Sequence, residues 1–498
     1  MYSDHTLQEI DEILAKSKTA FYQYKNFSLK ERANFMRAIA LEIDNLGEEL
    51  IKTAAEETNL SEKRLQAERK RTIFQLTSYA DAAEQGNWLE ARIDLGNANA
   101  IPPKPDLRKM LVPLGPVVVF GASNFPFAYS TAGGDTACAF AAGCPVIVKA
   151  HPAHVKTSTL VAKAILAATE KCNMPKGIFA HVYGADFKIG EYLVKHNNVK
   201  AVGFTGSYAG GRALFDLANQ RKTPIPVFAE MGSINPVFLL PDKLKKDHPW
   251  IAEQLSRSIT QDMGQFCTNP GLMISIKSEA LDLYINQLLE NIKEVAPAEM
   301  LHKGIAKNFS ENRSKAIAQE DVEVIYQSDV EQEKEEGIIT IATVPGKSFL
   351  SNHQLHAEIF GPYSLLVICK DKEELLAVAE NLEGQLTTTL MATQTDVNSH
   401  KELLNVLREK CGRLVLNGVP TGVEVALAMH HGGPFPSSTD SRFTAVGADG
   451  IKRFARPVSF QNWDDEFLPD ELKNQNPLNI WRTVNNELTQ AAVESLTL

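Results

Sequence analysis

The stretch Val117-Val118-Val119-Phe120-Gly121-Ala122-Ser123-Asn124-Phe125-Pro126-Phe127 decides the fold, because it joins a short apolar run directly to a turn containing Gly and Pro. Similar apolar runs follow at residues 146–148, 179–183, 201–204 and 227–230, and helical stretches lie near residues 155–171, 186–196 and 208–219. Short strands of nearly continuous apolar character that alternate with helices are typical of a parallel sheet covered on both faces. The sequence therefore predicts an α/β fold.

The segments on either side of this series have different patterns. Before it, Ser28 and Glu31 have the spacing of a capping box, and apolar residues at helical spacing follow them. A second helical stretch begins near Ser61. After it, a second α/β series runs from about residue 272 to 417, with expected strands at 273–276, 365–368 and 414–416. From Pro457 the chain is polar and irregular.

Length and composition narrow the class of protein. A chain of 498 residues is too long for one ordinary core, so we expect about two to four domains. The net charge of −10 argues against nucleic acid and anionic membranes as partners. No apolar run approaches the ~20 residues that span a bilayer, and the first residues lack the pattern of a signal peptide. The six cysteines are scattered without Cys-x-x-Cys pairs. We therefore expect a cytoplasmic protein without a disulfide framework or a metal site.

Several polar residues fall where expected strands end, which is where open α/β sheets bind ligands. Asn124 could donate its side-chain amide to an oxyanion, although an Asn before Phe-Pro is more often a turn former. Lys149 could reach a ribose or a phosphate, with a surface lysine as an equally good interpretation. The Gly-rich turn at 204–212 could bring a phosphate to a helix N-terminus, but it matches neither the dinucleotide fingerprint nor a P-loop.

Glu230 and Cys267 are the candidates for acid–base and nucleophilic chemistry. Glu230 ends an apolar strand, and burial there would raise its pKa toward the range of a general base. Cys267 follows a helix in the context Gly264-Gln265-Phe266-Cys267, and a thiolate is a strong nucleophile once its pKa is lowered. Most single cysteines are inert buried thiols, so neither residue is specific when it is taken alone.

The order of these elements is more specific than any one of them. Ser-Asn-Phe-Pro, strand-Lys, Phe-Thr-Gly-Ser, strand-Glu and Gly-Gln-x-Cys are followed by Glu358-Ile359-Phe360-Gly361-Pro362. This order and spacing resemble the aldehyde dehydrogenase superfamily over nearly the whole chain. The resemblance implies two Rossmann-like α/β domains, one cofactor-binding and one catalytic, plus a small oligomerisation element. We expect residues 1–93 and 114–232 in the first domain, 233–456 in the second, and 94–113 with 457–498 in the oligomerisation arm of a homodimer or homotetramer.

The resemblance also implies a role for each matching residue. Cys267 would attack an aldehyde to form a thiohemiacetal and then a thioester, Asn124 and the Cys267 N–H would hold the oxyanion, and Glu230 would activate the hydrolytic water. An NAD(P) cofactor would be bound by Lys149, Gly206, Ser207, Gly211, Glu358 and Phe360. Phe127 and Phe266 flank the proposed catalytic residues and could line an apolar substrate tunnel, or could equally belong to the core.

Some positions depart from the pattern of the family. A Lys is common nine positions after the oxyanion Asn, but Gly133 stands here, so a proton relay through that Lys is in doubt. Members that prefer NAD usually carry a Glu shortly after the strand Lys, whereas here His151 follows in a run without a carboxylate. Its absence removes repulsion against a 2′-phosphate, and Lys188 could add positive charge. We therefore expect the enzyme to prefer NADP as its cofactor, with NAD as the alternative.

A narrower resemblance concerns the C-terminal part of the chain. The segments His430-His431-Gly432-Gly433-Pro434, 441–447 and 477–482 are similar to the branch that contains NADP-dependent bacterial aldehyde dehydrogenases and α-ketoglutaric semialdehyde (2,5-dioxovalerate) dehydrogenases. The implied reaction is oxidation of that semialdehyde to 2-oxoglutarate. Alternatives are a dehydrogenase for other semialdehydes or aliphatic aldehydes, a CoA-acylating dehydrogenase, and a non-catalytic binding protein. A cofactor-free thiol hydrolase would need a His base, and neither catalytic segment contains one.

Overall fold

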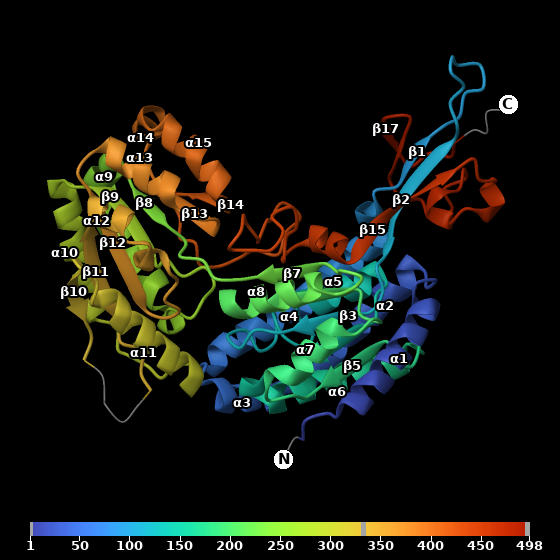
Figure 1. Ribbon diagram of the computed structural model, residues 1–498, viewed down its shortest axis with the longest axis horizontal. Helices are drawn as coiled ribbons and strands as arrows, with labels where there is room; N and C mark the ends of the chain where they lie inside the picture. Colours follow the sequence, from blue (N-terminus) through green and yellow to red (C-terminus); the bar gives the residue numbers. More distant parts are fainter. Residues whose placement is uncertain (1–2, 330–334, 494–498) are drawn as a thin grey trace.

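The computed structural model describes residues 3–329 and 335–493. Figure 1 shows two α/β lobes side by side and an arm of strands that projects away from both. The first lobe carries the N-terminal helices and the second is built from the middle of the chain. No helix in the described part of the chain has the length and apolar character needed to cross a membrane.

The first lobe contains a five-stranded sheet in which every neighbouring pair is parallel. Its strands, in the order β5-β4-β3-β6-β7, are β5 (Phe179–Val182), β4 (Val146–Lys149), β3 (Val117–Phe120), β6 (Ala201–Thr205) and β7 (Val227–Glu230). The chain proceeds from β3 in one direction and later restarts beside it with β6. This reversal of strand order between β3 and β6 is the place where open α/β sheets bind ligands. All five strands agree with the sequence prediction.

Helices cover both faces of this sheet. The crossover helices are α5 (Gly134–Ala142), α6 (Val155–Lys171), α7 (Phe187–Lys195) and α8 (Tyr208–Asn219). The N-terminal helices are α1 (Leu7–Tyr24), α2 (Leu29–Asn45), α3 (Gly47–Thr58) and α4 (Glu62–Gln85). The predicted capping box is present, because Ser28 Oγ accepts from Glu31 N and the Glu31 carboxylate accepts from Ser28 N. Ser61 caps α4 through its side chain alone, which accepts from Arg64 N, so both starts follow from local sequence.

The second lobe contains a seven-stranded sheet that is parallel except for its edge pair β10–β11. In spatial order its strands are β10 (Glu323–Gln327), β11 (Thr340–Pro345), β12 (Tyr363–Cys369), β9 (Leu272–Ile276), β8 (Val237–Leu239), β13 (Gln385–Met391) and β14 (Cys411–Leu416). Helices α9 (Pro241–Thr260) and α10 (Glu279–Lys293), which lie between β8 and β10 in the sequence, pack against each other. Helices α11 (Lys303–Ile317), α13 (Lys372–Asn381) and α15 (Lys401–Lys410) complete the cover. The sheet is therefore buried on both faces, as its apolar strands require.

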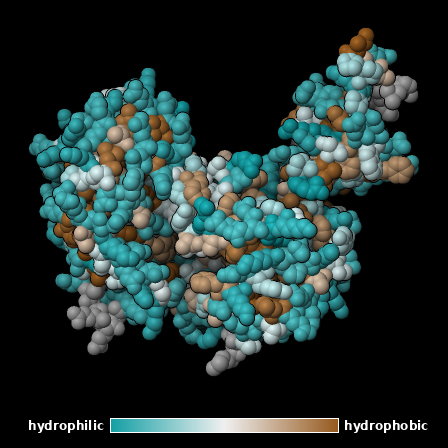
Figure 2. All heavy atoms as spheres, viewed as in Figure 1, coloured by the Kyte–Doolittle hydropathy of each residue, from teal (hydrophilic) through white to brown (hydrophobic). Residues whose placement is uncertain are grey.

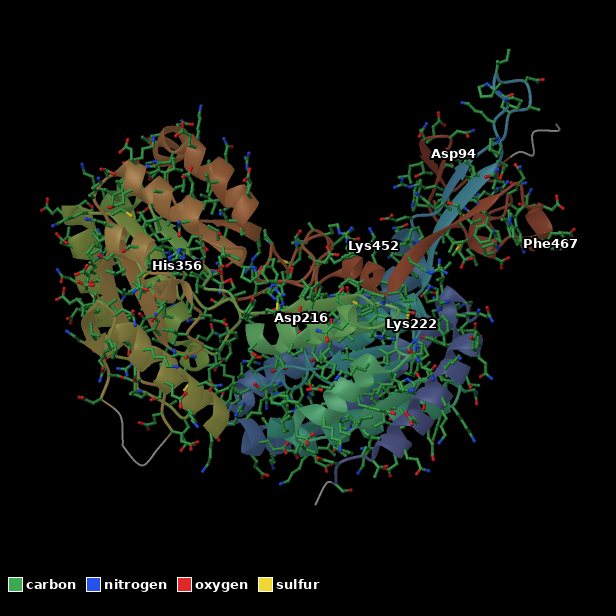
Figure 3. The ribbon with its side chains drawn as sticks, in the orientation of Figure 1. Asp94, Asp216, Lys222, His356, Lys452 and Phe467 are labelled. Carbon is green, nitrogen blue, oxygen red and sulfur yellow. The ribbon has the colours of Figure 1, made fainter. Side chains whose placement is uncertain are left out.

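The arm is a third sheet made from two distant parts of the chain. Its strands, in the order β15-β2-β1-β16-β17, are β15 (Ala455–Gln461), β2 (Leu107–Pro113), β1 (Arg92–Asp94), β16 (Arg482–Val484) and β17 (Glu487–Thr489). Asp94 and Phe467 both lie on this arm in Figure 3. Figure 2 shows a hollow between the arm and the second lobe.

The chain crosses back to the first lobe before it reaches the arm. Met231 N donates to Ser437 O, and Thr439 N donates to Ala229 O, so residues 437–439 lie along the end of β7. Further on, the 3-10 helix η5 (Ala448–Phe454) packs against α5. We expected residues 233–456 to form the catalytic domain as one block, and this boundary is wrong in its last part. Hydrogen bonds to β7 and the packing on α5 place this return segment with the first lobe.

Candidate active site

Cys267 lies in a tight turn after α9. The preceding 3-10 helix η3 (Gln261–Gly264) contains Asp262 at φ 45° and Met263 at φ 54°, and Gly264 follows at φ 61°. A Cβ on Gly264 would lie 2.4 Å from Gly361 O, so only glycine fits between the two backbones. These left-handed residues turn the chain sharply and present Cys267 at the boundary between the lobes.

The side chain of Asn235 stabilises the turn that carries Cys267. Its Nδ2 donates to Cys267 O at 2.8 Å and to Asn269 O at 2.9 Å, and its Oδ1 accepts from Thr387 Oγ1 at 2.9 Å. Gln385 Oε1 in turn accepts from Ile234 N at 2.9 Å. The network is buried, so its bonds are stronger than they would be in water and the turn is rigid.

Glu230, His431 and Cys267 meet at this turn. Glu230 is the last residue of β7, and His431 comes from the segment that returns to the first lobe. His431 Nε2 lies 3.0 Å from Glu230 Oε1 and 3.7 Å from Cys267 Sγ. One ligand atom from each residue lies within 4.8 Å of the other two. A nucleophile, an imidazole and a carboxylate at these distances can exchange protons directly.

The charges of this trio are coupled. Burial alone raises the pKa of Glu230, but the His431 ring and a hydrogen bond with Cys267 outweigh burial, so the pKa of Glu230 is lowered. The expectation that burial would raise it is therefore wrong, because a buried partner for the carboxylate was missing from the sequence argument. Burial and the negative charge of Glu230 raise the pKa of the Cys267 thiol. The resting site therefore holds a carboxylate beside a thiol.

Asn124 lies on the other side of the turn. Its Nδ2 donates to Gln265 O at 3.0 Å, which leaves a second amide N–H for another acceptor. The loop that carries Asn124 is fixed from α4, because Glu68 Oε1 accepts from Phe127 N and Ala128 N at 2.9 Å each. The loop and the catalytic turn are also joined by Arg64, which donates to Asn124 O and to Asp262.

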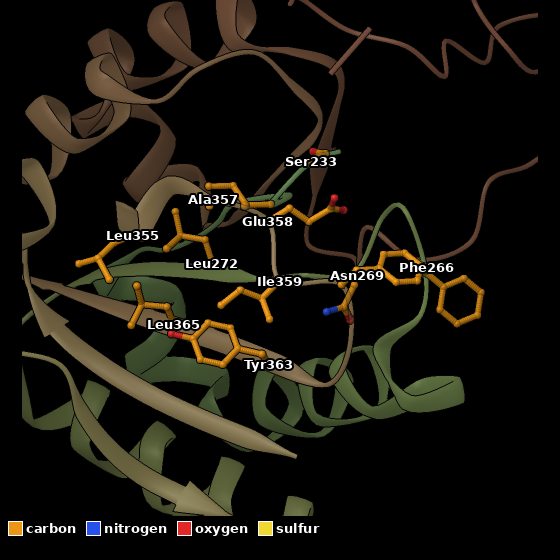
Figure 4. Close-up of a pocket in the computed structure, with 13 residues that line it drawn as sticks. Ser233, Phe266, Asn269, Leu272, Leu355, Ala357, Glu358, Ile359, Tyr363 and Leu365 are labelled. Atoms are coloured by element: carbon orange, nitrogen blue, oxygen red, sulfur yellow. The ribbon is translucent and has the colours of Figure 1, made fainter. Parts of the chain in front are cut away.

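A pocket lies on the second-lobe side of Cys267. Figure 4 shows Phe266, Asn269 and Glu358 around it, together with Ser233. Phe360 also lines it. Burial raises the pKa of Glu358 to about 7, with a smaller contribution from the charge of Glu230. A Cβ on Gly232 would lie 2.4 Å from Glu358 Oε2, so the glycine leaves room for this carboxylate. A secluded acceptor of this kind suits the hydroxyl groups of a ribose.

The remaining cofactor candidates lie at the carboxyl edge of the first sheet. Lys149 is the last residue of β4, and the nearby Asp4 and Asp186 partly offset the lowering of its pKa by burial. Gly206 and Ser207 are exposed between β6 and α8, and Ser207 caps α8 by accepting from Gly210 N. Gly211 packs closely against Met231. A helix N-terminus and a lysine on this edge fit a dinucleotide phosphate and ribose.

His151 and Lys188 lie near this edge but differ in state. The ring of His151 stacks on His154 at 5.3 Å and lies 6.2 Å from the ring of His302 in the second lobe. Burial and the other histidines lower the pKa of His151 well below its usual value, so it is neutral at pH 7. Lys188 is exposed in the first turn of α7. Of these two residues, it is therefore Lys188 that brings a positive charge to the edge.

The two predicted substrate phenylalanines have different positions. Phe266 lines the pocket beside Glu358 and lies 5.7 Å from the ring of Phe125. Phe127 is 1% exposed and belongs to the core of the first lobe, so its place in the tunnel wall is wrong. The turn after Asn124 rotates its ring inward, and Tyr129 instead approaches His431, with ring centroids 6.3 Å apart.

Sequence reasoning missed His431 as part of the site. It lies 201 positions from Glu230 and 164 from Cys267, so it belongs to neither of the two catalytic segments. The argument that a thiol hydrolase would lack a histidine holds for those segments, but the fold brings a histidine to Cys267 from a distant one. The available signal was the His430-His431-Gly432-Gly433 motif itself, which carries two histidines beside flexible glycines.

The fold and the site define a class of protein with two α/β lobes, a parallel sheet whose strand order reverses between β3 and β6, and a cysteine beside a histidine and a glutamate at the boundary between the lobes. Residues 2–458 match the model of the aldehyde dehydrogenase family, so the chain belongs to this family, whose members oxidise aldehydes with NAD(P).

Individual relatives agree with this assignment. The α-ketoglutaric semialdehyde dehydrogenase of Acinetobacter baylyi is 43% identical over 492 residues, which are 98% of this chain and 93% of that protein. The α-ketoglutaric semialdehyde dehydrogenase 2 of Azospirillum brasilense is 46% identical over 475 residues, 95% of this chain and 90% of its own. The 1-pyrroline-5-carboxylate dehydrogenase from Thermus, solved with bound NAD, superposes with a TM-score of 0.77 at 22% identity, over 92% of this chain and 86% of that chain. At this identity the last similarity shows the fold alone.

Proposed function

We propose that this enzyme oxidises α-ketoglutaric semialdehyde (2,5-dioxopentanoate) to 2-oxoglutarate. The two relatives that share 43% and 46% identity over nearly the whole chain carry that activity in their names. The observation that carries the chemistry is the approach of Cys267, His431 and Glu230 within 4.8 Å of one another. The amide of Asn124 lies across the same turn.

In the first step Cys267 gives its proton to Glu230 while its sulfur bonds to the aldehyde carbon. The carbonyl oxygen becomes an oxyanion, which the free N–H of Asn124 and the backbone N–H of Cys267 stabilise. His431 donates from Nε2 to Glu230, which is the tautomer that a carboxylate at 3.0 Å favours. Glu230 then releases its proton to solvent and is a carboxylate again.

The second step needs a hydride acceptor and a base. A bound nicotinamide would supply the acceptor, and the carbon that gives up the hydride would regain its C=O bond as a thioester on Cys267. Glu230 takes a proton from the water that attacks this thioester, and the sulfur leaves with that proton returned to it. The acid formed on the substrate releases its remaining proton to solvent, so the products are a carboxylate and the resting thiol. Water resolves the thioester where CoA would do so in an acylating dehydrogenase.

We also propose how the cofactor is held. Glu358 would accept from the nicotinamide ribose, with Phe360 beside the ring, and Lys149 would bind the adenosine ribose. Gly206, Ser207 and Gly211 would lie along the pyrophosphate. The run after Lys149 contains no carboxylate, and Lys188 adds a charge, so we propose NADP as the preferred cofactor. His151 would contact the adenosine as a neutral ring. Asp4 and Asp186 oppose a 2′-phosphate, so the preference is the first quantity to measure.

The assembly and location are part of the same proposal. The arm exposes large apolar side chains, namely Ile101, Trp463, Phe467, Trp481 and Leu488. Exposed apolar groups concentrated on one projecting sheet favour a homodimer or homotetramer. All six cysteines are free, which fits the reducing conditions of the cytoplasm.

One experiment tests the function. The purified enzyme is given α-ketoglutaric semialdehyde with NADP or NAD, and formation of the reduced nicotinamide is followed with and without CoA. We expect turnover without CoA, a higher kcat/KM for NADP, and no turnover by Cys267→Ala, which keeps cofactor binding. Absence of turnover across semialdehydes and alkanals, or full activity of Cys267→Ala, would refute the proposal, and a clear preference for NAD would refute its cofactor part.

A further inference from the structure

Two arginines, Arg71 and Arg413, donate hydrogen bonds to the same loop at residues 420–423. Arg71 on α4 donates from Nη1 to Val423 O. Arg413 on β14 donates from Nη1 to Gly422 O at 2.9 Å and from Nη2 to Pro420 O. The loop at 420–423 follows β14 and precedes the segment that carries His431.

Both arginines also contact the surroundings of the reaction centre. The charge of Arg71 lies close to the hydroxyl of Tyr129, whose ring lies 6.3 Å from the ring of His431. Arg413 follows Gly412, where a Cβ would lie 2.1 Å from Gly432 O, so β14 packs directly against the backbone next to His431. Burial and Glu230 raise the pKa of the Cys267 thiol, and Arg413 lies close enough for its charge to offset a small part of that rise.

Neither charge is neutralised by the protein. Across residues 3–329 and 335–493, no acidic group forms an ion pair with Arg71 or Arg413. The Nε atom of each is buried without a hydrogen-bond partner. Other arginines near the site differ, since Arg64 pairs with Glu68 at 2.6 Å and Arg453 pairs with Asp135 at 2.7 Å. Unpaired guanidinium groups in a partly buried site are costly unless a ligand supplies the negative charge.

We propose that Arg71 and Arg413 bind the carboxylate at the far end of the substrate while its aldehyde carbon meets Cys267. The inference rests on the proposed function and names the chemical class of aldehyde that the site selects, an aldehyde with a terminal carboxylate. Guanidinium groups form charge-assisted and often bidentate hydrogen bonds with carboxylates, which fix position as well as contribute affinity.

The competing interpretation is that the two arginines only support the loop through its carbonyl groups. Arg71→Gln and Arg413→Gln separate the two roles, because glutamine can still donate to a carbonyl but carries no charge. Arg69→Gln is the matched control, since Arg69 lies on the same helix and donates to Gly47 O, away from the site. Each variant is assayed with α-ketoglutaric semialdehyde and with pentanal, a neutral aldehyde of the same chain length.

We expect each site variant to lose roughly 10- to 100-fold in kcat/KM for the semialdehyde, chiefly through KM, as loss of a charged hydrogen bond implies. The value for pentanal should change by less than about threefold, so selectivity collapses. Arg69→Gln should match the parent enzyme with both aldehydes. Equal losses with both aldehydes, or no loss with either, would overturn the inference in favour of loop support.

A binding measurement keeps the inference separate from the proposed function. Calorimetric titration of Cys267→Ala with 2-oxoglutarate requires no turnover and reports only recognition of the carboxylate. Binding that is lost in Cys267→Ala/Arg71→Gln but kept in Cys267→Ala/Arg69→Gln supports the arginine site, even if another aldehyde proves to be the substrate. Equal binding by all three proteins refutes it, whatever reaction the enzyme carries out.

Discussion

His431 Nε2 lies 3.0 Å from Glu230 Oε1, although the two residues are 201 positions apart in the chain. Burial alone would raise the pKa of Glu230, so that the carboxylate would take up a proton already at a higher pH. The imidazole of His431 outweighs burial and lowers this pKa. The same nitrogen faces Cys267 Sγ at 3.7 Å. The imidazole therefore sets the protonation state of the base and touches the nucleophile that the base serves.

Replacing His431 should shift the pH dependence of the reaction. In His431→Phe the burial of Glu230 is no longer offset, so its pKa rises and the carboxylate is lost at a higher pH. The acidic limb of the kcat/KM profile should move upward, and the rate at pH 7 should fall by about 10²-fold or more. His431→Gln retains a donor and should recover part of the shift. His430→Gln is the neighbouring control, and an unmoved acidic limb in His431→Phe would contradict the role.

Removing the base should separate the two half-reactions. Glu230→Gln keeps the shape of the side chain but cannot take a proton from water, so hydrolysis of the thioester should slow by about 10²- to 10⁴-fold. Stopped-flow absorbance should then show a burst of reduced nicotinamide that matches the number of sites, followed by a slow steady state. Steady turnover at the parent rate would assign the base to another group.

The stability of the turn that carries Cys267 should depend on the side-chain amide of Asn235. Asn235→Ala leaves the carbonyls of Cys267 and Asn269 without their donor, and each buried orphan costs about 1–3 kcal/mol. The native φ of 45° adds strain for alanine. We expect a lower urea midpoint and a faster, less selective alkylation of Cys267. Asn235→Asp keeps the size but not the donors and should behave similarly, so a fully stable Asn235→Asp would show that the network is dispensable.

Glu358 should make both stability and cofactor binding depend on pH. Burial raises its pKa to about 7, above the value in the unfolded chain, so the native state binds the proton more tightly. Its contribution to stability is therefore greatest at low pH and is lost as pH rises toward 7. Glu358→Gln should raise the free energy of unfolding at pH 8.5 by about 2 kcal/mol, below the full value of 1.36 kcal/mol per pKa unit because the side chain is partly exposed.

The same variant gives a second readout. An ionised Glu358 accepts hydrogen bonds from a ribose, so cofactor affinity in the parent enzyme should weaken as pH falls below about 7. In Glu358→Gln the affinity should be lower at neutral pH and insensitive to pH between 6 and 8. Fluorescence titration with NADP measures both, and an unchanged pH dependence in the variant would show that another group titrates.

Local sequence predicted those parts of the fold and site that depend on neighbouring residues. The apolar run at 117–120 and the capping box at Ser28 involve residues close in the chain, and both were found as predicted. Helix α5 was missed because its small residues, such as Ala137 and Ala141, give no helical stripe and pack on all sides. His431 and the position of Phe127 depend on how a distant segment and a tight turn are placed, which periodicity cannot report.

The return of the chain from the second lobe to the first, across residues 437–454, has a consequence during synthesis. The strands of both lobes have all left the ribosome before this segment does. At that stage the segment that carries His431 is not yet held against the first lobe by residues 437–454, and Arg453 has yet to reach Asp135. The complete site therefore forms late, after translation has produced the strands of both lobes. A prematurely terminated chain would contain Cys267 without the return segment that completes the site.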